Sequence, residues 1–74
     1  MNYYETKEIT EAINLIQVAR MASDGGNYLY SAAVRLQFVM DCGETLGARQ
    51  LATTVAEAFD MMSHIDELRN EAAA

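Results

Sequence analysis

The sequence predicts an all-α fold: an antiparallel three-helix bundle, or a helical hairpin completed by a third helix. Three observations support this prediction. The chain contains no proline, its apolar residues recur at helical spacing, and its glycines divide it into three segments. Short connections favour antiparallel neighbours. We therefore expect a single small helical domain over residues 1–74, with helices over about 4–23, 27–43 and 46–70.

The first segment has the pattern of a helix that packs on one side. Ile9, Ile13 and Ile16 recur along one face, and polar residues occupy the opposite face. Asn2, followed three residues later by Glu5, has the spacing of a capping box at the start of the helix. The glycines after Asp24 then end the segment, because glycine readily adopts the conformations that helix C-termini require.

The central segment carries apolar residues on two sides. Its broader face consists of Leu29, Ala32, Ala33, Leu36, Val39 and Met40. A second stripe, at i, i+4 spacing, consists of Tyr30, Val34, Phe38 and Cys42. A helix that packs on one side only shows a single stripe. The second stripe therefore predicts burial from two directions, either by both neighbouring segments or by another subunit.

The third segment shows the longest apolar series of the chain. This heptad-like series consists of Leu51, Val55, Ala58, Met62 and Ile65. The opposite side is mostly acidic and includes Glu57, Asp60, His64 and Glu67. We expect one continuous helix with a solvated acidic face, which could also dock a basic protein surface.

The length and the cysteine count point to self-association. A chain of 74 residues buries a limited core, and its single cysteine cannot form an internal disulfide. No Cys/His cluster has zinc spacing, so a second copy is the remaining source of stability, and a homodimer is expected. The N-terminus does not resemble a signal peptide, and no apolar run approaches the roughly 20 residues that span a bilayer. We expect a cytoplasmic protein with no membrane segment.

The charge balance argues against direct binding of nucleic acid. The formal net charge is −6, and the five basic residues are scattered along the chain as Lys7, Arg20, Arg35, Arg49 and Arg69. Nucleic-acid binding normally needs a cluster of Lys and Arg side chains that neutralises phosphates. We therefore expect a protein partner.

No motif in the chain predicts catalysis or a cofactor. His64 has no second histidine to complete a metal site, and Cys42 has no base near it in sequence. Because Cys42 lies on an apolar stripe, we expect it to be buried and inert. The glycines at Gly43 and Gly47 lack the lysine of a phosphate-binding loop. We expect no enzymatic activity, no metal and no cofactor.

One stretch, Leu36–Leu51, is similar to the central signature of histidine phosphotransfer domains. Leu46–Ala48 matches the Leu-Gly-Ala turn of that signature. Gln37 stands where the phosphorylated histidine should be, and Met40 and Asp41 replace the expected lysine and glycine. The resemblance implies a relative that cannot carry phosphate and docks proteins.

These observations together predict a small acidic, non-enzymatic interaction protein that regulates or inhibits a macromolecular partner. Small size, acidity and the absence of catalytic motifs are typical of bacterial and phage regulators and inhibitors, including anti-defence proteins. The predicted partner interface comprises Tyr30, Val34, Phe38, Cys42, Glu57, Asp60, His64 and Glu67. One alternative is a structural or assembly adaptor, or a small chaperone subunit. A further alternative is an oligomer that binds a small anion or nucleotide, with Arg35, Arg49 and tyrosines lining a shared pocket.

Overall fold

Four helices make up the fold over residues 1–73, the part of the chain that the computed structural model describes. They are α1 (Tyr3–Met21), α2 (Gly26–Cys42), α3 (Leu46–Ala58) and α4 (Met62–Ala73). The predicted all-α class is confirmed, and no strand occurs in this range. The predicted number of three helices is wrong, because the expected third helix is divided into α3 and α4.

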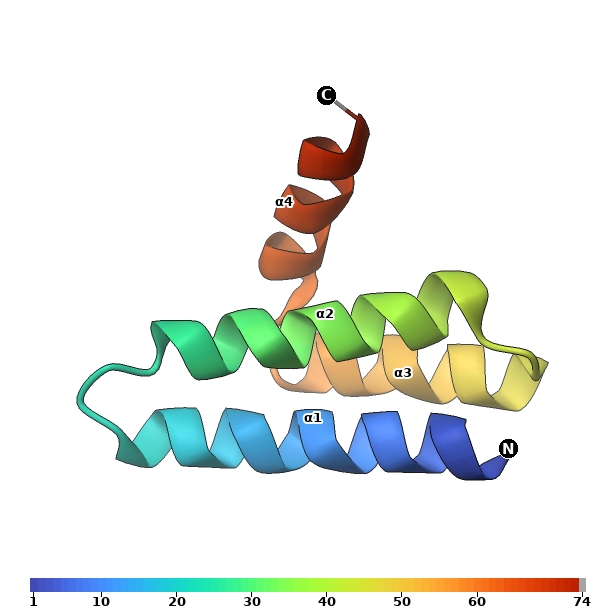
Figure 1. The fold of residues 1–74 in the computed structure, drawn as a ribbon, viewed down its shortest axis with the longest axis horizontal. Helices are drawn as coiled ribbons and strands as arrows, with labels where there is room; N and C mark the ends of the chain where they lie inside the picture. The colour runs from blue at the N-terminus through green and yellow to red at the C-terminus, as the bar shows by residue number, and fades with distance from the viewer. Residues whose placement is uncertain (74) are drawn as a thin grey trace.

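The central position of α2 organises the other helices. Figure 1 shows α1 and α2 side by side and antiparallel, with α3 behind them and antiparallel to α2. Helix α4 rises away from this layer at a steep angle (Figure 1). Of the four helices, α2 alone packs substantially against each of the other three. None of the helices in residues 1–73 has the length and apolar character that crossing a membrane requires.

The core lies between the broad apolar face of α2 and the facing sides of its neighbours. Small side chains dominate it, so the helix axes can approach closely. The buried apolar residues are Ile9, Ala12, Ile16, Ala32, Ala33, Leu36, Val39, Ala48, Ala52, Val55, Ala56, Met61 and Ile65. Four of them come from the face of α2 that the sequence pattern identified as its broader apolar side.

A Schellman-type turn separates α3 from α4. The backbone N–H of Met61 donates to the carbonyl of Ala56 at 2.7 Å, and the N–H of Asp60 donates to that of Glu57 at 3.2 Å. Asp60 adopts a φ of 59°, the left-handed conformation that this motif requires. The Met61 side chain is buried and shares the core with Ala56, which is the apolar contact that accompanies the motif. The chain therefore turns after Ala58.

The turn divides the acidic face that was expected along a single helix. Glu57 lies on α3, Asp60 lies in the turn, and His64 and Glu67 lie on α4. Helix α4 is attached through Ile65, its one fully buried residue among those described. The predicted continuous acidic face over 46–70 is therefore wrong, because its residues belong to two helices that run in different directions (Figure 1).

Helix α4 also contacts the C-terminal end of α2 through an ion pair. The Arg69 guanidinium contacts Asp41 through two hydrogen bonds, at 2.7 and 3.1 Å. Gln37 donates a further hydrogen bond to the same carboxylate at 2.8 Å. These donors hold the pKa of Asp41 below its ordinary value, with Arg69 as the larger cause. The pair links α4 to the C-terminal end of α2.

We predict that Asp60→Gly stabilises the protein. A left-handed conformation costs an L-residue roughly 1 to 2 kcal/mol, which glycine avoids, so the free energy of unfolding should rise by about 1 kcal/mol. The matched control is Glu67→Gly in the exposed middle of α4, which should lower it by about 1 kcal/mol. Urea denaturation of both variants tests the turn. A destabilising effect of similar size at both positions would mean that helix α3 continues through residue 60.

Candidate interaction site on α1 and α2

The second apolar stripe of α2 is exposed to solvent. Tyr30, Val34 and Phe38 are 57%, 38% and 56% exposed, and Cys42 is also exposed. The reason is geometric: α1 and α3 pack on the broad face of α2, and α4 contacts the flank that carries Asp41. Burial of the stripe within the chain, one of its two expected explanations, is wrong. The expectation that Cys42 is buried is wrong for the same reason.

A buried carboxylate joins α1 to the start of α3 beside this stripe. Glu5 is only 4% exposed. Its carboxylate accepts the backbone N–H of Asn2 at 2.9 Å, while the Asn2 side chain accepts the N–H of Glu5 at 2.9 Å. This arrangement confirms the predicted capping box. The same carboxylate accepts the backbone N–H and the hydroxyl of Thr45, the N-cap of α3, at 3.0 Å each.

The hydrogen bonds to Glu5 favour its charged form. The N–H of Asn2 is the largest influence, the N–H of Thr45 the next, and together they lower the pKa of Glu5 against the opposing effect of burial. Gly43 allows the close approach that this arrangement needs. A Cβ at residue 43 would lie 3.1 Å from Glu5 Oε2 and would collide with the carbonyl of Val39. The junction therefore depends on a glycine immediately after α2.

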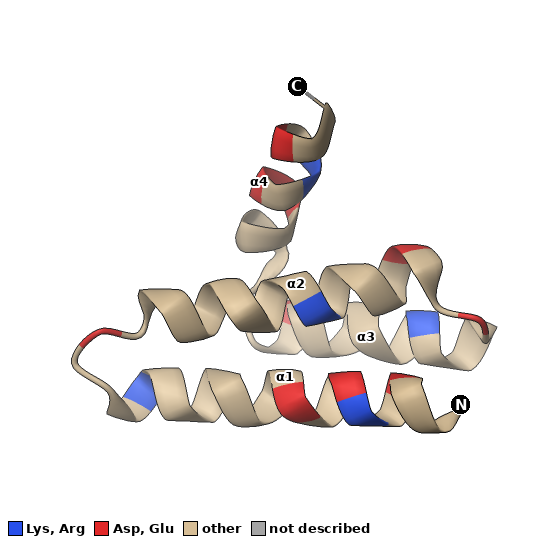
Figure 2. Cartoon of the chain, viewed as in Figure 1, with Lys and Arg blue, Asp and Glu red and all other residues tan. Residues whose placement is uncertain are grey.

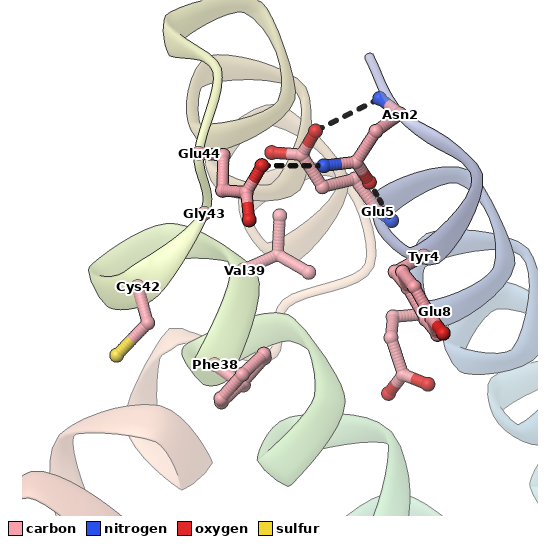
Figure 3. Close-up of a pocket in the computed structure, with 9 residues that line it drawn as sticks. All are labelled: Asn2, Tyr4, Glu5, Glu8, Phe38, Val39, Cys42, Gly43 and Glu44. Carbon is pink, nitrogen blue, oxygen red and sulfur yellow. Dashed lines mark hydrogen bonds between the residues drawn. The ribbon is translucent and has the colours of Figure 1, made fainter.

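A cavity of about 320 Å³ opens between the start of α1 and the end of α2. We call it the α1–α2 groove. Its lining combines aromatic, aliphatic and acidic side chains, as Figure 3 shows. The residues are Asn2, Tyr4, Glu5, Glu8, Phe38, Val39, Cys42, Gly43 and Glu44. Phe38 and Cys42 of the stripe line this groove, so the exposed face of α2 continues into it.

The carboxylates that line the groove differ in the hydrogen bonds and ion contacts that they already make within the chain. Glu5 accepts hydrogen bonds from Asn2 and Thr45. Glu8 has a long contact of 3.8 Å to Arg35, whose closer partner is Glu11 at 3.0 Å. Glu44 accepts one hydrogen bond, from the Asn2 amide at 3.2 Å. Among residues 1–73, no lysine or arginine is a lining residue of the groove, so its charged lining consists of carboxylates.

The arginines of the described chain are already engaged within it. The Arg20 guanidinium lies 5.1 Å from the centroid of the Phe59 ring, and Arg49 donates to the carbonyl of Gly43. Arg35 and Arg69 form the ion pairs described above. Figure 2 shows these basic residues distributed singly over the helices. Arg35 and Arg49 lie on different helices and contact different partners, so they form no shared anion site within one chain.

The predicted interface residues of the third segment are distributed over α3, the turn that follows it and α4. A second cavity, of about 240 Å³, brings Asp60 and His64 beside Arg20 and Phe59. Glu57 and Glu67 are exposed on separate helices. Among residues 1–73, no group of three or more His, Cys, Asp or Glu side chains is placed to hold a metal ion. Phe38 and Cys42 line the α1–α2 groove, whereas Asp60 and His64 line this second cavity.

Sequence reasoning missed Tyr4, Glu8 and Glu44 as members of the site. Tyr4 and Glu8 are one helical turn apart on the flank of α1 that faces α2, and this spacing is the one signal that was visible in the sequence. Glu44 enters the site through the turn after α2, which no local pattern places beside the start of α1.

Comparisons with protein-family models, with curated proteins and with solved structures found no match to this chain. The resemblance to phosphotransfer domains also gains no structural support at its best-matching residues. Leu46–Ala48 form the first turn of α3, not a turn between helices.

We predict that Glu5→Gln lowers the melting temperature at neutral pH, because the amide would present N–H donors to the N–H groups that Glu5 accepts. Because the pKa of Glu5 is lowered in the folded protein, its charged carboxylate contributes its full stabilisation at pH values above the ordinary glutamate pKa of about 4.3. This stabilisation is lost as the pH falls below that value and through the lowered pKa of the folded state. The difference in melting temperature between wild type and Glu5→Gln should therefore become smaller at acidic pH.

Thermal melts of both proteins between about pH 6 and about pH 3 measure this dependence. Glu67→Gln removes an exposed carboxylate from α4 and is the matched control, with a melting temperature close to that of wild type. A difference between wild type and Glu5→Gln that stays constant over the whole pH range would contradict the assigned role of Glu5.

Proposed function

We propose that the protein is a small acidic, non-enzymatic interaction protein that regulates or inhibits a macromolecular partner through the exposed face of α2. The observation that carries the proposal is the exposure of Tyr30, Val34 and Phe38 along the helix that contacts all the others. Large aromatic side chains aligned on one rigid helix are typical of protein interfaces.

The surroundings of the stripe support docking of a protein. Tyr4 of α1 is exposed near Phe38 across the groove and extends the aromatic surface, and its ring packs edge-on against Tyr3 with centroids 5.8 Å apart. Tyrosine offers a large contact area with a polar tip. Exposed large apolar side chains that gather on one face mark interaction sites, whereas single scattered ones do not. The α1–α2 face thus has the composition of an interface core with a polar rim.

A role without catalysis is supported by how the titratable groups are used. The buried carboxylate of Glu5 is occupied by hydrogen bonds from Asn2 and Thr45, which join the starts of α1 and α3. His64 and Cys42 lie in different cavities, on α4 and α2. A nucleophile and its base need direct hydrogen-bond contact. The placement of these groups favours an interaction protein over an enzyme.

A regulatory or inhibitory role follows from size and charge. The net charge of −6 favours a basic protein surface and opposes direct contact with nucleic acid. Bacterial and phage regulators and inhibitors, such as anti-defence proteins, share this profile. An anion-binding function is not proposed further, because the arginines of the described chain are engaged and the α1–α2 groove contains carboxylates.

One observation favours a structural role through self-association as the second candidate. Tyr30 and Phe38 lie one turn on either side of Val34. An antiparallel pair of α2 helices centred on Val34 would therefore bring aromatic side chains against each other symmetrically. In this candidate the stripe is a homodimer seam, and the protein is an assembly adaptor or a small chaperone subunit.

The substitution Phe38→Asp tests the proposed docking face. Because Phe38 is half exposed, the variant should keep its helical content and melting temperature close to those of wild type while losing the docked partner. The matched control, Gln50→Asp, adds the same charge to an exposed site on α3. Circular dichroism and affinity capture from the cell that produces the protein measure both properties.

The outcomes separate the two candidates. Loss of a captured protein with Phe38→Asp and its retention with Gln50→Asp would support the proposed function. A dimeric wild type that becomes monomeric on the Phe38→Asp substitution, with no captured protein in either case, would favour the structural candidate. A folded Phe38→Asp variant with unchanged partners and unchanged light scattering would show that the stripe is not an interface.

A further inference from the structure

The α1–α2 groove has two chemically distinct walls. Phe38 and Val39 of α2, together with Tyr4 of α1, supply the apolar wall. Glu8 and Glu44 supply carboxylates at the edges of the groove (Figure 3). Glu5 already accepts hydrogen bonds from Asn2 and Thr45. The carboxylates with fewer contacts are Glu8, which lies 3.8 Å from the Arg35 guanidinium, and Glu44, which accepts one hydrogen bond from Asn2. The lining is thus aromatic and acidic at once.

This combination is suited to a lysine or arginine side chain. The cationic head is attracted to carboxylates and to the faces of aromatic rings, while its methylene stem covers apolar surface. The cavity volume of about 320 Å³ lies at the small end of ligand pockets, which start at about 300 Å³, and leaves room for one long side chain. Within the described chain, no lysine or arginine lines the cavity.

The stripe on α2 extends the groove in one direction. From Phe38 the apolar surface continues one turn to Val34 and another to Tyr30, so an occupant of the groove would continue along α2. Docking an apolar face along a rigid helix is the usual way in which an amphipathic helix is recognised. An occupant that fits both features carries a basic side chain at one end and apolar side chains at helical spacing behind it.

Charge selects among the possible occupants. A second copy of this chain would bring a net charge of −6 to a groove already bordered by carboxylates, and four of its five basic residues, the arginines, are engaged in its own fold, which leaves Lys7. A nucleic acid would bring phosphates to the same carboxylates, which oppose it. A cationic protein segment is the occupant whose charge is complementary to the groove.

We propose that the α1–α2 groove is an anchor site for a Lys or Arg side chain of a cationic amphipathic segment in the partner protein, with Phe38 and Tyr4 as its apolar walls and Glu8 and Glu44 as its counter-charges. This inference rests on the proposed function and specifies the chemistry of its partner. The anchor sets the register of the segment, and the α2 stripe contributes most of the apolar contact area.

A direct test uses a short amphipathic helical peptide of Leu, Ala and Lys, and a counterpart with Glu in place of each Lys. Binding to the full chain is measured by titration calorimetry at low and at physiological salt. The Lys peptide should bind and the Glu peptide should not. The double variant Glu8→Gln/Glu44→Gln should weaken binding of the Lys peptide about tenfold, because it removes two partly exposed charge pairs.

Two control variants separate a specific site from overall charge. Glu57→Gln/Glu67→Gln makes the same change in net charge away from the groove and should change the affinity by less than about twofold. Phe38→Ala removes the apolar wall and should weaken binding about tenfold. Circular dichroism confirms that each variant keeps its fold. An equal loss of affinity in both double variants, or no loss with Phe38→Ala, would overturn the anchor site.

The failure of this inference is distinguishable from failure of the proposed function. If Phe38→Asp loses its natural partner while Glu8→Gln/Glu44→Gln keeps it at full affinity, the docking face stands and the cationic anchor is overturned. If the wild type is a dimer that the Lys peptide cannot dissociate, a second copy covers the groove and the inference is likewise overturned.

Discussion

The carboxylate of Glu5 is the constraint on which the geometry of this small fold depends. It accepts hydrogen bonds from Asn2 at the start of α1 and from Thr45 at the start of α3, and Thr45 lies 40 residues after Glu5 in sequence. Unsatisfied N–H groups at helix N-termini are favourable positions for negative charge. By joining two such termini, Glu5 closes one end of the helical layer. The same junction forms the base of the α1–α2 groove and so places Tyr4, Glu8 and Glu44 around Phe38.

Whereas Glu5 closes the layer at the start of α3, the left-handed turn at Asp60 turns the chain out of the layer at the end of α3. A continuous third helix was expected to provide one long acidic face, but the turn redirects the chain and directs α4 away from the layer. Ile65 and the Arg69–Asp41 pair then hold α4 against one flank of α2. The surface of α2 between this flank and α1 stays uncovered. The exposure of Tyr30, Val34 and Phe38 therefore follows from where α4 is placed.

Much of this fold was predictable from local patterns, and the parts that were not depend on contacts distant in sequence. Helical periodicity placed α1 and α2 to within a few residues, and the spacing of Asn2 and Glu5 correctly predicted a capping box. The break at Asp60 escaped prediction because the apolar series from Leu51 to Ile65 continues through it with no glycine or proline. Met61 and Ile65 are buried in the structure, and both would also be expected on the apolar side of one continuous helix. The pattern therefore could not distinguish one helix from two.

The candidate site was predicted in part. The second stripe of α2 was visible as an unexplained apolar series, whereas Glu8 and Glu44 became part of the site only through tertiary packing. The most direct test of the docking face is a photo-crosslinking amino acid placed at residue 38 and, separately, at residue 67 in the producing cell. The proposed docking face predicts a crosslink to another protein from residue 38 and none from residue 67. Crosslinks from residue 67 alone would place the interface on α4 and contradict it.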